Sequence, residues 1–427
     1  MKTIEIHPCG PIHGTIRPPG SKSITNRALV CAALAEGTST LTGALDSDDT
    51  RVMVQGLHRL GLEVLDDPRQ SVIQVAGCAG RPPAKGAEID AANSGTTIRF
   101  LTAVATLGQG RFRLDGSPRM RQRPIGDLLA ALGQLGADAV SEAGNRCPPV
   151  VIQANGLPGG KAVVAGDISS QFLSALLMAA PCAASPVELA VVGELVSQPY
   201  VEMTLAVMNS FGVSVRREGL SRFLVSGQES YQCRQYTIEP DASAASYFFA
   251  AAAVTGGTVT VEGLSRSSLQ GDVAFCDCLA KMGCDVSYGD GTITVIGHRL
   301  HGIEIDMNAV SDTVQTLGAV ALFAEGSTTI TNVGHIRHKE TDRLAALAIE
   351  LRKLGAKVEE RADGLTIVPD ALNGAEIDTY DDHRMAMSMA LVGLASKGVV
   401  IRDPDCTAKT YPRFFQDLES LVRGQTQ

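Results

Sequence analysis

The sequence of 427 residues contains no apolar run long enough to cross a membrane. Apolar stretches such as Phe172–Pro181 and Phe248–Val254 fall far short of the roughly 20 residues that a membrane helix needs. The N-terminal residues form no continuous apolar segment, so they lack the pattern of a secretion signal. Ser/Pro-rich and charge-rich blocks, which mark disordered chains, are also missing. The composition therefore predicts a globular cytoplasmic enzyme of two or more domains, with no membrane partner.

The sequence also lacks paired cysteines and an excess of basic residues. Its ten cysteines do not have the CxxC spacing of a zinc site, so we expect reduced, mostly buried thiols and no bound metal. The formal net charge of −9 argues against a broad basic surface for nucleic acid. If the protein binds anions, its positive charge has to be concentrated locally.

One segment pattern recurs five times along the chain. It reads LHRLGLEV at residues 57–64 and returns as LGQLGADA, MNSFGVSV, LAKMGCDV and LRKLGAKV. A helix with apolar residues at i and i+3 is predicted to end at the glycine, which adopts a left-handed conformation at little cost. A strand is predicted to follow. The shared glycines, 71 to 76 residues apart, are Gly61, Gly136, Gly212, Gly283 and Gly355.

A more apolar helix and a further strand precede each of these repeat ends, as in RALVCAALAEGTSTLTG. Because the upstream helix is rich in Ala, Leu and Val on all sides, we expect it to be buried, whereas the downstream helix has a polar face. A sixth upstream helix at residues 383–395 and a strand at 398–402 are followed by no such glycine. The N-terminal segment, up to about Pro19, is predicted to complete this last unit.

These units predict an α/β protein of six βαβαββ-type repeats, three in each of two domains. Domain I comprises residues 1–20 and 240–427 and contains both termini, and domain II comprises residues 21–239. Pro- and Gly-containing segments near residues 18–21 and 238–241 are the expected hinge crossovers. We expect the functional site in a cleft between the two halves.

Polar segments directly precede the six inner helices. Taken one at a time, their Ser, Asp and Asn residues are explained as helix N-caps. If equivalent helices in a domain point the same way, their N-termini gather on one face, each with free N–H groups and about half a positive charge. Two such faces opposed across a hinge form an anion-binding cleft. The segments are GSKSITNR (20–27), NSGTTIR (93–99), ISSQF (168–172), PDASAAS (240–246), VSDTVQT (310–316) and DDHRMAM (381–387).

Basic side chains lie in or near these helix starts although the chain is acidic overall. A solvated surface charge explains any single one, but it explains the whole set less well. In SPRMRQRPIG, Pro124 suits the first position of a helix. In RHKETDRL, Lys339 and Arg343 are predicted on one helical face, where a bound anion offsets their repulsion. The remaining basic residues are Lys22, Arg27, Arg99, Arg119, Arg121, Arg123, Arg384 and Lys409.

Taken together and in this order, the motifs resemble those of the 5-enolpyruvylshikimate-3-phosphate synthase family. Short Gly/Ser patterns recur widely, so each motif alone is weak evidence, whereas the ordered set runs nearly end to end and is specific. The motifs are PGSKSITNRAL, LDSDDT, NSGTTIRF, RPIG, ISSQFLSALLMAAP, SQPYVEMTL, DASAASYF, KETDRL, DDHRMAM and CTAKTYP.

The resemblance implies a fold and a reaction. The fold is a two-domain inside-out α/β barrel with three repeats per domain. The reaction joins phosphoenolpyruvate to the 5-hydroxyl of shikimate 3-phosphate and releases phosphate, a step of aromatic amino-acid biosynthesis. It needs an acid/base pair and strong anion stabilisation, and no metal or organic cofactor. A monomer is expected, and the herbicide glyphosate is expected to occupy the phosphoenolpyruvate site.

The resemblance also implies roles for individual residues. Asp312 matches the base at the attacking hydroxyl, Glu340 a second proton-transfer group, and Lys22 a candidate acid that contacts both substrates. The division of proton transfers among the three is left open. Matching positions for shikimate 3-phosphate are Lys22, Ser23, Arg27, Ser169, Ser170, Gln171, Ser197, Tyr200, Asp312, His335 and Lys339. Those for phosphoenolpyruvate are Lys22, Asn93, Gly95, Arg123, Gln171, Arg343, Arg384 and Lys409.

Two positions depart from the family pattern. His335 stands where bacterial members often have Asn, which puts its contact to shikimate 3-phosphate in doubt. Phe100 stands where many glyphosate-sensitive members have Pro, so the degree of sensitivity stays open. Gly95 favours glyphosate binding because a residue without a side chain lets the backbone approach the ligand closely.

Three alternatives remain in view. UDP-N-acetylglucosamine enolpyruvyl transferases share the fold and the donor, but their usual loop cysteine has no counterpart around residues 117–123. RNA-terminal-phosphate cyclases share the repeat unit, but the acidic balance and the absence of their histidine nucleophile motif argue against them. A non-catalytic binding protein of this fold would be favoured by loss of Asp312, Glu340 or Lys22, and all three are present.

Overall fold

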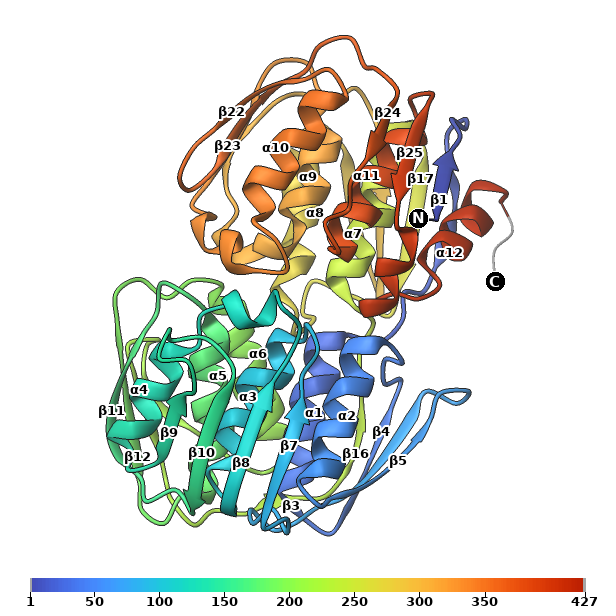
Figure 1. Cartoon of the computed structure of the whole chain (residues 1–427). Helices are drawn as coiled ribbons and strands as arrows, with labels where there is room; N and C mark the ends of the chain where they lie inside the picture. The colour runs from blue at the N-terminus through green and yellow to red at the C-terminus, as the bar shows by residue number, and fades with distance from the viewer. Residues whose placement is uncertain (1, 425–427) are drawn as a thin grey trace. The chain divides into compact units, whose positions relative to one another are not determined.

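The computed structural model describes residues 2–424. Its internal contacts divide the chain into two compact units: unit 1, Met1–Pro19 with Glu239–Gln427, and unit 2, Gly20–Ile238. Each unit has a hydrophobic core of its own. The chain is coloured from blue to red along its length in Figure 1. Within residues 2–424 no helix is long and apolar enough to pass through a bilayer.

Unit 2 contains three four-stranded sheets of one topology, in the orders β16-β4-β6-β5, β7-β8-β10-β9 and β11-β12-β14-β13. In each sheet the first pair of strands is parallel and the other two pairs are antiparallel. The strands are β4 (Thr38–Thr42), β5 (Glu63–Asp67), β6 (Val72–Ala76), β7 (Gly86–Asp90), β8 (Gln109–Asp115), β9 (Asp138–Ser141), β10 (Val150–Asn155), β11 (Gly160–Ala165), β12 (Val187–Val192), β13 (Arg216–Glu218), β14 (Arg222–Val225) and β16 (Gln235–Thr237), with a small pair β3 (Ala35–Glu36) and β15 (Tyr231–Gln232).

Unit 1 repeats this topology in the sheets β2-β17-β19-β18 and β20-β21-β23-β22, and a third sheet, β24-β25-β1, has three strands. The parallel pair again comes first, between β2 and β17, β20 and β21, and β24 and β25. The strands are β1 (Thr3–Ile6), β2 (His13–Ile16), β17 (Thr258–Glu262), β18 (Asp285–Gly289), β19 (Thr292–Ile296), β20 (Glu304–Asp306), β21 (Thr328–Thr331), β22 (Lys357–Glu360), β23 (Leu365–Val368), β24 (Ala375–Ile377) and β25 (Val399–Arg402).

The N-terminal segment is shared between two sheets. As predicted, β1 completes the last repeat, because it pairs antiparallel with β25. The prediction was wrong for β2, which joins β17 of another sheet. The reason is visible in the topology. β2 and β16 are each the last strand before the chain crosses to the other unit. Each is the edge strand, parallel to its neighbour, of the first sheet in the unit that the chain is leaving.

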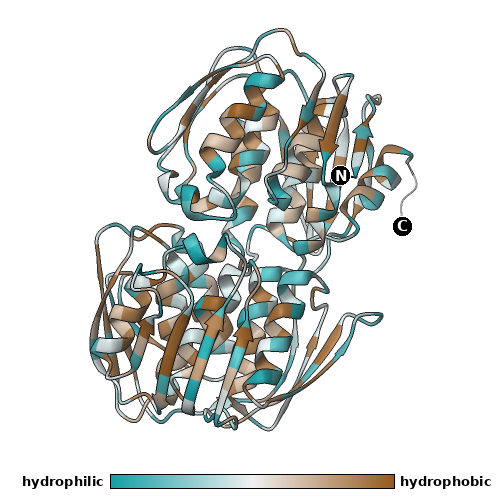
Figure 2. Cartoon of the chain, in the orientation of Figure 1, coloured by the Kyte–Doolittle hydropathy of each residue, from teal (hydrophilic) through white to brown (hydrophobic). Residues whose placement is uncertain are grey.

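In the described part of the chain each unit has three inner and three outer helices, and Figure 1 labels them. All 11 residues of α3 and all 11 of α11 are buried, as the even spread of apolar residues predicted. Residues coloured as hydrophobic in Figure 2 lie along the strands and helices of each unit. The inner helices are α1 (Lys22–Leu34), α3 (Gly95–Ala105) and α5 (Ser170–Ala179) in unit 2, and α7 (Ala242–Thr255), α9 (Val314–Ala321) and α11 (His383–Gly393) in unit 1.

The outer helices end where the sequence predicted. Each of the first five is followed, after one residue, by a repeat glycine with positive φ: 88° at Gly61, 87° at Gly136, 88° at Gly212, 111° at Gly283 and 106° at Gly355. Only a residue without a Cβ takes this conformation without strain. These helices are α2 (Asp48–Arg59), α4 (Gly126–Gln134), α6 (Gln198–Ser210), α8 (Phe275–Lys281), α10 (Arg343–Lys353) and the terminal α12 (Phe414–Val422).

Short 3₁₀ segments connect several of these elements. They are η1 (Met120–Gln122), η2 (Ala180–Cys182), η3 (Gly271–Ala274), η4 (Asn308–Thr313), η5 (Gly334–His338) and η6 (Pro404–Lys409). The ten cysteines are free thiols, of which Cys31, Cys276, Cys278 and Cys284 are buried and Cys233 is exposed. The expectation of mostly buried thiols therefore holds for only part of the set.

Candidate functional site

The inner helices of unit 2 begin at serine N-caps. The hydroxyls of Ser21, Ser94 and Ser169 accept hydrogen bonds from the backbone N–H groups of Ile24, Thr97 and Gln171. This confirms the capping role of the polar segments. The first turns also contact one another: the Asn26 side chain donates to Thr96 Oγ1 at 2.8 Å. As the sequence predicted, the N-termini of α1 and α3 therefore gather at one end of the unit.

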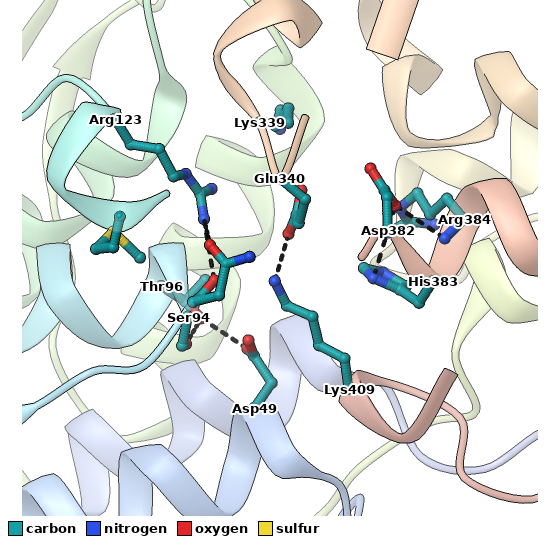
Figure 3. Close-up of polar contacts among 12 residues, drawn as sticks. Asp49, Ser94, Thr96, Arg123, Lys339, Glu340, Asp382, His383, Arg384 and Lys409 are labelled. Atoms are coloured by element: carbon teal, nitrogen blue, oxygen red, sulfur yellow. Dashed lines mark hydrogen bonds and ion pairs between the residues drawn. The ribbon is translucent and has the colours of Figure 1, made fainter. Parts of the chain in front are cut away.

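A buried carboxylate that the sequence analysis missed joins these turns. Asp49, at the start of α2, accepts hydrogen bonds from Asn26 Nδ2 at 3.2 Å and Thr96 Oγ1 at 3.1 Å. Asp49 and Thr96 are among the side chains drawn in Figure 3. The segment LDSDDT gave only a weak signal for this contact, because its acidic residues also suit the positively charged start of a helix.

Arg123 lies against the loop that begins α3. Its Nη1 donates to the carbonyl oxygen of Asn93 at 3.0 Å and to the Asn93 side chain at 3.3 Å. A Cβ on Gly95 would lie only 2.5 Å from Arg123 Nη2. Gly95 is therefore needed for the close packing of the arginine as well as for any ligand above it. The structure thus brings three residues proposed for phosphoenolpyruvate together: Asn93, Gly95 and Arg123.

Arg99 links this loop to α5. Its Nη1 donates to Gln171 Oε1 at 2.6 Å, and its Nη2 donates to the carbonyl oxygen of Pro124 at 3.2 Å. Gln171 is thereby placed beside the loop whose residues are predicted to bind phosphoenolpyruvate. The prediction that Pro124 opens a helix was wrong, because α4 begins at Gly126. The carbonyl of Pro124 binds Arg99 instead, which fixes the chain before the helix starts.

Arg27 is only 1% exposed and holds α1, α5 and α6 together. Its guanidinium donates to Thr204 Oγ1 at 2.7 Å, to the Ser23 carbonyl at 2.9 Å and to the Tyr200 carbonyl at 3.2 Å. The rings of Phe100 and Tyr200 lie 5.3 and 5.9 Å from it. Burial lowers the pKa of Arg27 to about 10, so the group stays charged near neutral pH.

The other unit 2 residues lie at the same helix starts. Lys22 and Ser23 open α1, and Ser170 opens α5 after its cap Ser169. Ser197 precedes α6 with a left-handed backbone, φ 53°. Tyr200 follows in the first turn of that helix. Of these residues, Ser170 and Ser197 are buried and the others are half-buried.

In unit 1, Asp312 is surrounded by three basic side chains. Its Oδ2 accepts from Arg384 Nη2 at 2.8 Å, and its Oδ1 lies 3.2 Å from Arg343 Nη1 and 3.6 Å from Lys339 Nζ. Asp312 belongs to η4, directly before α9, whereas Arg384 lies in the first turn of α11. Side-chain hydrogen bonds between Thr316 and Ser246, and between Thr316 and Ser388, connect the first two turns of α7, α9 and α11. The helix starts of unit 1 therefore also gather, as predicted.

Glu340 pairs with two further cations. Arg343 Nη2 donates to its Oε2 at 2.9 Å, and Lys409 Nζ donates to its Oε1 at 2.8 Å. Figure 3 shows the Lys409 side chain pointing at Glu340. Asp312 and Glu340, the two proposed proton-transfer carboxylates, thus bind opposite nitrogens of one guanidinium. The structure brings together every residue that the sequence analysis assigned to this unit for phosphoenolpyruvate: Arg343, Arg384 and Lys409.

The predicted placement of Lys339 and Arg343 on one helical face was wrong. Lys339 ends η5 with an extended backbone, and Asp342 caps the new helix α10, which begins at Arg343. The Asp342 carboxylate accepts from the backbone N–H of Ala345 at 3.0 Å and so fixes that start. Both cations nevertheless reach Asp312, from two different elements.

Burial and neighbouring charges set the protonation of several groups in this cluster. Burial works against the charge of Arg343, but Asp382, Glu340 and Asp312 outweigh it and raise its pKa. Burial and the neighbouring Lys339 lower the pKa of His335 to about 3, so its imidazole is neutral near physiological pH. His335 therefore offers a neutral hydrogen-bonding group beside Asp312 rather than a positive charge.

The cluster contains four basic side chains, Lys339, Arg343, Arg384 and Lys409, against Asp312, Glu340 and the buried Asp382. It is therefore suited to bind an anion that competes with the internal carboxylates for the same donors. Within residues 2–424, no group of three or more His, Cys, Asp or Glu side chains has the arrangement of a metal site. The chemistry that the cluster supports is proton transfer beside a stabilised anion.

Comparison with solved structures defines the class of fold. An EPSP synthase structure from Acinetobacter baumannii superimposes with a TM-score of 0.82, covering 100% of this chain and 99% of that one at 24% identity. A second structure of EPSP synthase from the same organism gives a TM-score of 0.80. The fold is accordingly the mixed α/β fold of EPSP synthase, an inside-out arrangement of sheets around helices in each unit.

Sequence comparison identifies the family. The family model for EPSP synthase (3-phosphoshikimate 1-carboxyvinyltransferase) matches residues 6–418. Proteins named 3-phosphoshikimate 1-carboxyvinyltransferase from Shewanella baltica and Shewanella oneidensis are each 50% identical over 424 residues, covering 99% of this chain and all of theirs. The chain belongs to the EPSP synthase family, and it is a transferase of the shikimate route to aromatic amino acids.

Proposed function

We propose that the chain transfers the enolpyruvyl group of phosphoenolpyruvate to the 5-hydroxyl of shikimate 3-phosphate. The residues assigned to this reaction are those at the helix starts of unit 2 and those of the charged cluster around Arg343 in unit 1. The products are 5-enolpyruvylshikimate 3-phosphate and inorganic phosphate. Full-length likeness to the family supports the reaction. The observation that carries the assignment of residues is the binding of Asp312 and Glu340 to one buried arginine, Arg343.

Proton transfer occurs at two atoms in this reaction. The 5-hydroxyl attacks C2 of phosphoenolpyruvate and loses its proton, while C3 gains a proton. In the second step the C–O bond to phosphate breaks and C3 loses a proton again, which restores the double bond. We assign Asp312 to the hydroxyl proton, and Glu340 and Lys22 to the proton at C3. A single guanidinium holds both carboxylates in place, so their spacing does not depend on flexible side chains.

The cations of unit 1 are assigned to the anionic groups of phosphoenolpyruvate. Arg343 and Arg384 present planar donors to a carboxylate or phosphate, and Lys409 presents a point charge. In the structure these donors bind Asp312 and Glu340. Substrate binding then exchanges part of those contacts for contacts to the ligand.

The helix starts of unit 2 provide the other assigned contacts. Arg123, Asn93 and Gly95 are assigned to phosphoenolpyruvate, together with Gln171. Hydroxyl-bearing and basic residues are assigned to shikimate 3-phosphate. The basic ones are assigned to its phosphate and its carboxylate. The guanidinium of Arg27 has five N–H donors and makes four hydrogen bonds within the protein, so we assign to it one contact to the substrate and the positioning of its neighbours. The residues for shikimate 3-phosphate are Lys22, Ser23, Arg27, Ser169, Ser170, Gln171, Ser197, Tyr200, Asp312, His335 and Lys339.

We also propose a location, an assembly state and an inhibitor for the enzyme. The enzyme acts in the cytoplasm as a monomer, uses no cofactor, and binds glyphosate in place of phosphoenolpyruvate. Each unit folds as a domain around its own core. Phe100, which distinguishes this chain from many glyphosate-sensitive members, is buried and stacks on Arg27. Its ring therefore acts on the shikimate 3-phosphate side as well as on the loop of Gly95.

A choice of acceptors tests the proposal. The protein is incubated with phosphoenolpyruvate and either shikimate 3-phosphate or UDP-N-acetylglucosamine, and ³¹P NMR follows loss of the enol phosphate signal. We expect inorganic phosphate and a new phosphate monoester signal with shikimate 3-phosphate only. Turnover with UDP-N-acetylglucosamine would identify the paralogous transferase instead. Binding of shikimate 3-phosphate without any phosphate release would identify a binding protein.

A further inference from the structure

Two consecutive residues of unit 1 have a backbone conformation that L-residues rarely adopt. Tyr380 has φ 56° and Asp381 has φ 54°, and neither is glycine. They form the turn between β24 and α11, directly before Asp382. Strained residues of this kind persist only where the surrounding structure holds them. The contacts that hold this turn therefore determine where the following residues lie.

The residues directly after the turn, Asp382 and Arg384 among them, belong to the charged cluster around Arg343 that is assigned to phosphoenolpyruvate. Asp382 caps α11 through the backbone N–H of Arg384, at 2.9 Å, and binds Arg343 with both carboxylate oxygens. Arg384 in turn binds Asp312. A change in the turn of Tyr380 and Asp381 would thus be transmitted to both arginines.

Helix α10 contacts this segment at two points. At its start, Arg343 binds Asp382. Two turns later, Glu350 accepts a hydrogen bond from the Tyr380 hydroxyl at 2.6 Å and another from the backbone N–H of Asp378 at 3.2 Å. Residues seven apart lie on the same face of a helix. One face of α10 therefore holds the segment on both sides of the left-handed turn.

Glu350 is fully buried although it takes no part in the reaction assigned above. Lys353 Nζ neutralises it at 2.9 Å and also binds Asp378, which Arg402 holds from the other side at 2.9 Å. Burial and the adjacent Glu350 raise the pKa of Tyr380, so its phenol remains a hydrogen-bond donor. A buried carboxylate needs hydrogen-bond or charged partners, and Glu350 has Tyr380, Asp378 and Lys353. Of these three, Tyr380 is the one with a left-handed backbone.

We propose that Glu350 and Tyr380 are a positioning pair for phosphoenolpyruvate: their hydrogen bond holds the left-handed turn that places Asp382, Arg343 and Arg384. The inference rests on the proposed function of those two arginines. The pair touches no reacting atom and acts through the turn. Loss of the contact should affect phosphoenolpyruvate more than shikimate 3-phosphate, because only the former is assigned to Arg343 and Arg384.

Removing one hydroxyl tests the pair. In Tyr380→Phe, kcat/KM for phosphoenolpyruvate is expected to fall roughly ten- to a hundredfold, as for a small misplacement of binding groups. KM for shikimate 3-phosphate should change less than this, since most residues assigned to it lie in unit 2 and only Asp312 among them contacts Arg343 and Arg384. The matched control is Tyr288→Phe, which removes a hydroxyl 3.5 Å from Asp277 in the same unit. It should leave both kinetic constants unchanged.

Hydrogen exchange separates failure of this inference from failure of the proposed function. Amides of residues 379–385 should exchange faster in Tyr380→Phe than in wild type or Tyr288→Phe, whether or not the protein turns over substrate. Glu350→Gln keeps an acceptor oxygen for the hydroxyl and should be less impaired than Tyr380→Phe. Unchanged kinetics and exchange in Tyr380→Phe would overturn the proposal. So would equal rises in KM for both substrates, or a loss in Glu350→Gln that Tyr380→Phe does not share.

Discussion

Arg343 and Asp382 form a buried ion pair with two contacts, 2.7 Å from Nε to Oδ2 and 3.2 Å from Nη2 to Oδ1. Arg343 is 1% exposed and Asp382 is fully buried. The pair fixes the plane of the guanidinium, so that Nη1 reaches Asp312 and Nη2, which also contacts Asp382, reaches Glu340. One arginine therefore sets the positions of both carboxylates that are assigned to proton transfer.

The first prediction concerns the stability that this pair provides. Asp382→Asn keeps the side-chain shape but removes a buried charge, and breaking a buried pair typically costs about 3–5 kcal/mol. Urea unfolding should show a loss of this size. The control Asp285→Asn breaks an exposed contact to His298 and should cost at most about 1 kcal/mol. Equal stability of both variants would show that Asp382 is not the partner that keeps Arg343 in place.

The second prediction concerns the general base. Asp312→Asn retains hydrogen bonding to Arg384 but not the ability to take the hydroxyl proton, so kcat should fall roughly 10²–10⁴-fold. Calorimetry should find binding of shikimate 3-phosphate largely retained. Asp306→Asn, an exposed aspartate of β20, serves as the control and should keep wild-type turnover. Full activity of Asp312→Asn would remove Asp312 from its assigned role.

The third prediction concerns the geometry of Arg123. A lysine keeps the charge but lacks the planar fork that contacts Asn93 and an anion together. Because a charged hydrogen bond contributes about 1.5–3 kcal/mol, Arg123→Lys should raise KM for phosphoenolpyruvate roughly ten- to a hundredfold. Arg113→Lys, in β8 of the same unit and bound to Glu142, should change it by no more than about twofold. Steady-state kinetics at saturating shikimate 3-phosphate measure both.

The fourth prediction is a pH dependence of stability. The folded-state pKa of His335 is about 3, below the value of 6.5 for an unperturbed histidine, and that of the buried His383 is also well below it. Between these values the unfolded chain binds protons that the folded chain does not, so the free energy of unfolding falls as the pH drops below 6.5. His335→Asn should weaken this dependence. Denaturant titrations at pH 5 and pH 7 compare the two proteins, and identical differences would place the protonation change elsewhere.

The fifth prediction concerns glyphosate. If it takes the place of phosphoenolpyruvate, it should raise the apparent KM for that substrate without lowering kcat. Initial rates at several concentrations of both compounds measure the pattern. Unchanged turnover at saturating glyphosate, with phosphoenolpyruvate near its KM, would show that the loop of Gly95 and Phe100 does not admit the inhibitor.

Local physics explains which parts of the fold were readable from the sequence. Helix ends at the five repeat glycines follow from one backbone conformation, and the helix starts follow from capping residues such as Ser94 and Asp382. Both signals depend on a few neighbouring residues. The pairing of strands that are distant in the sequence could not be predicted from such local signals. The pairing of β2 with β17 joins segments more than 240 residues apart, and nothing in either segment specifies the partner.

The site was predictable in kind but not in its contacts. Sequence placed the basic residues at helix starts, and the family motifs selected among them. It placed Lys339 and Arg343 on one helix because their spacing suits one, whereas Asp342 starts a new helix between them. It also missed Asp49 and the role of Asp382 toward Arg343, since a buried carboxylate is explained only by partners that other segments supply.

The central claim is that phosphate release requires shikimate 3-phosphate and passes through Asp312. A coupled assay of phosphate release, with each substrate omitted in turn, tests this most directly. We predict release only with both substrates, in amounts equal to the shikimate 3-phosphate consumed, and a loss of roughly 10²-fold or more in Asp312→Asn. Release by the wild-type protein without shikimate 3-phosphate, or no release with both substrates, would contradict the account.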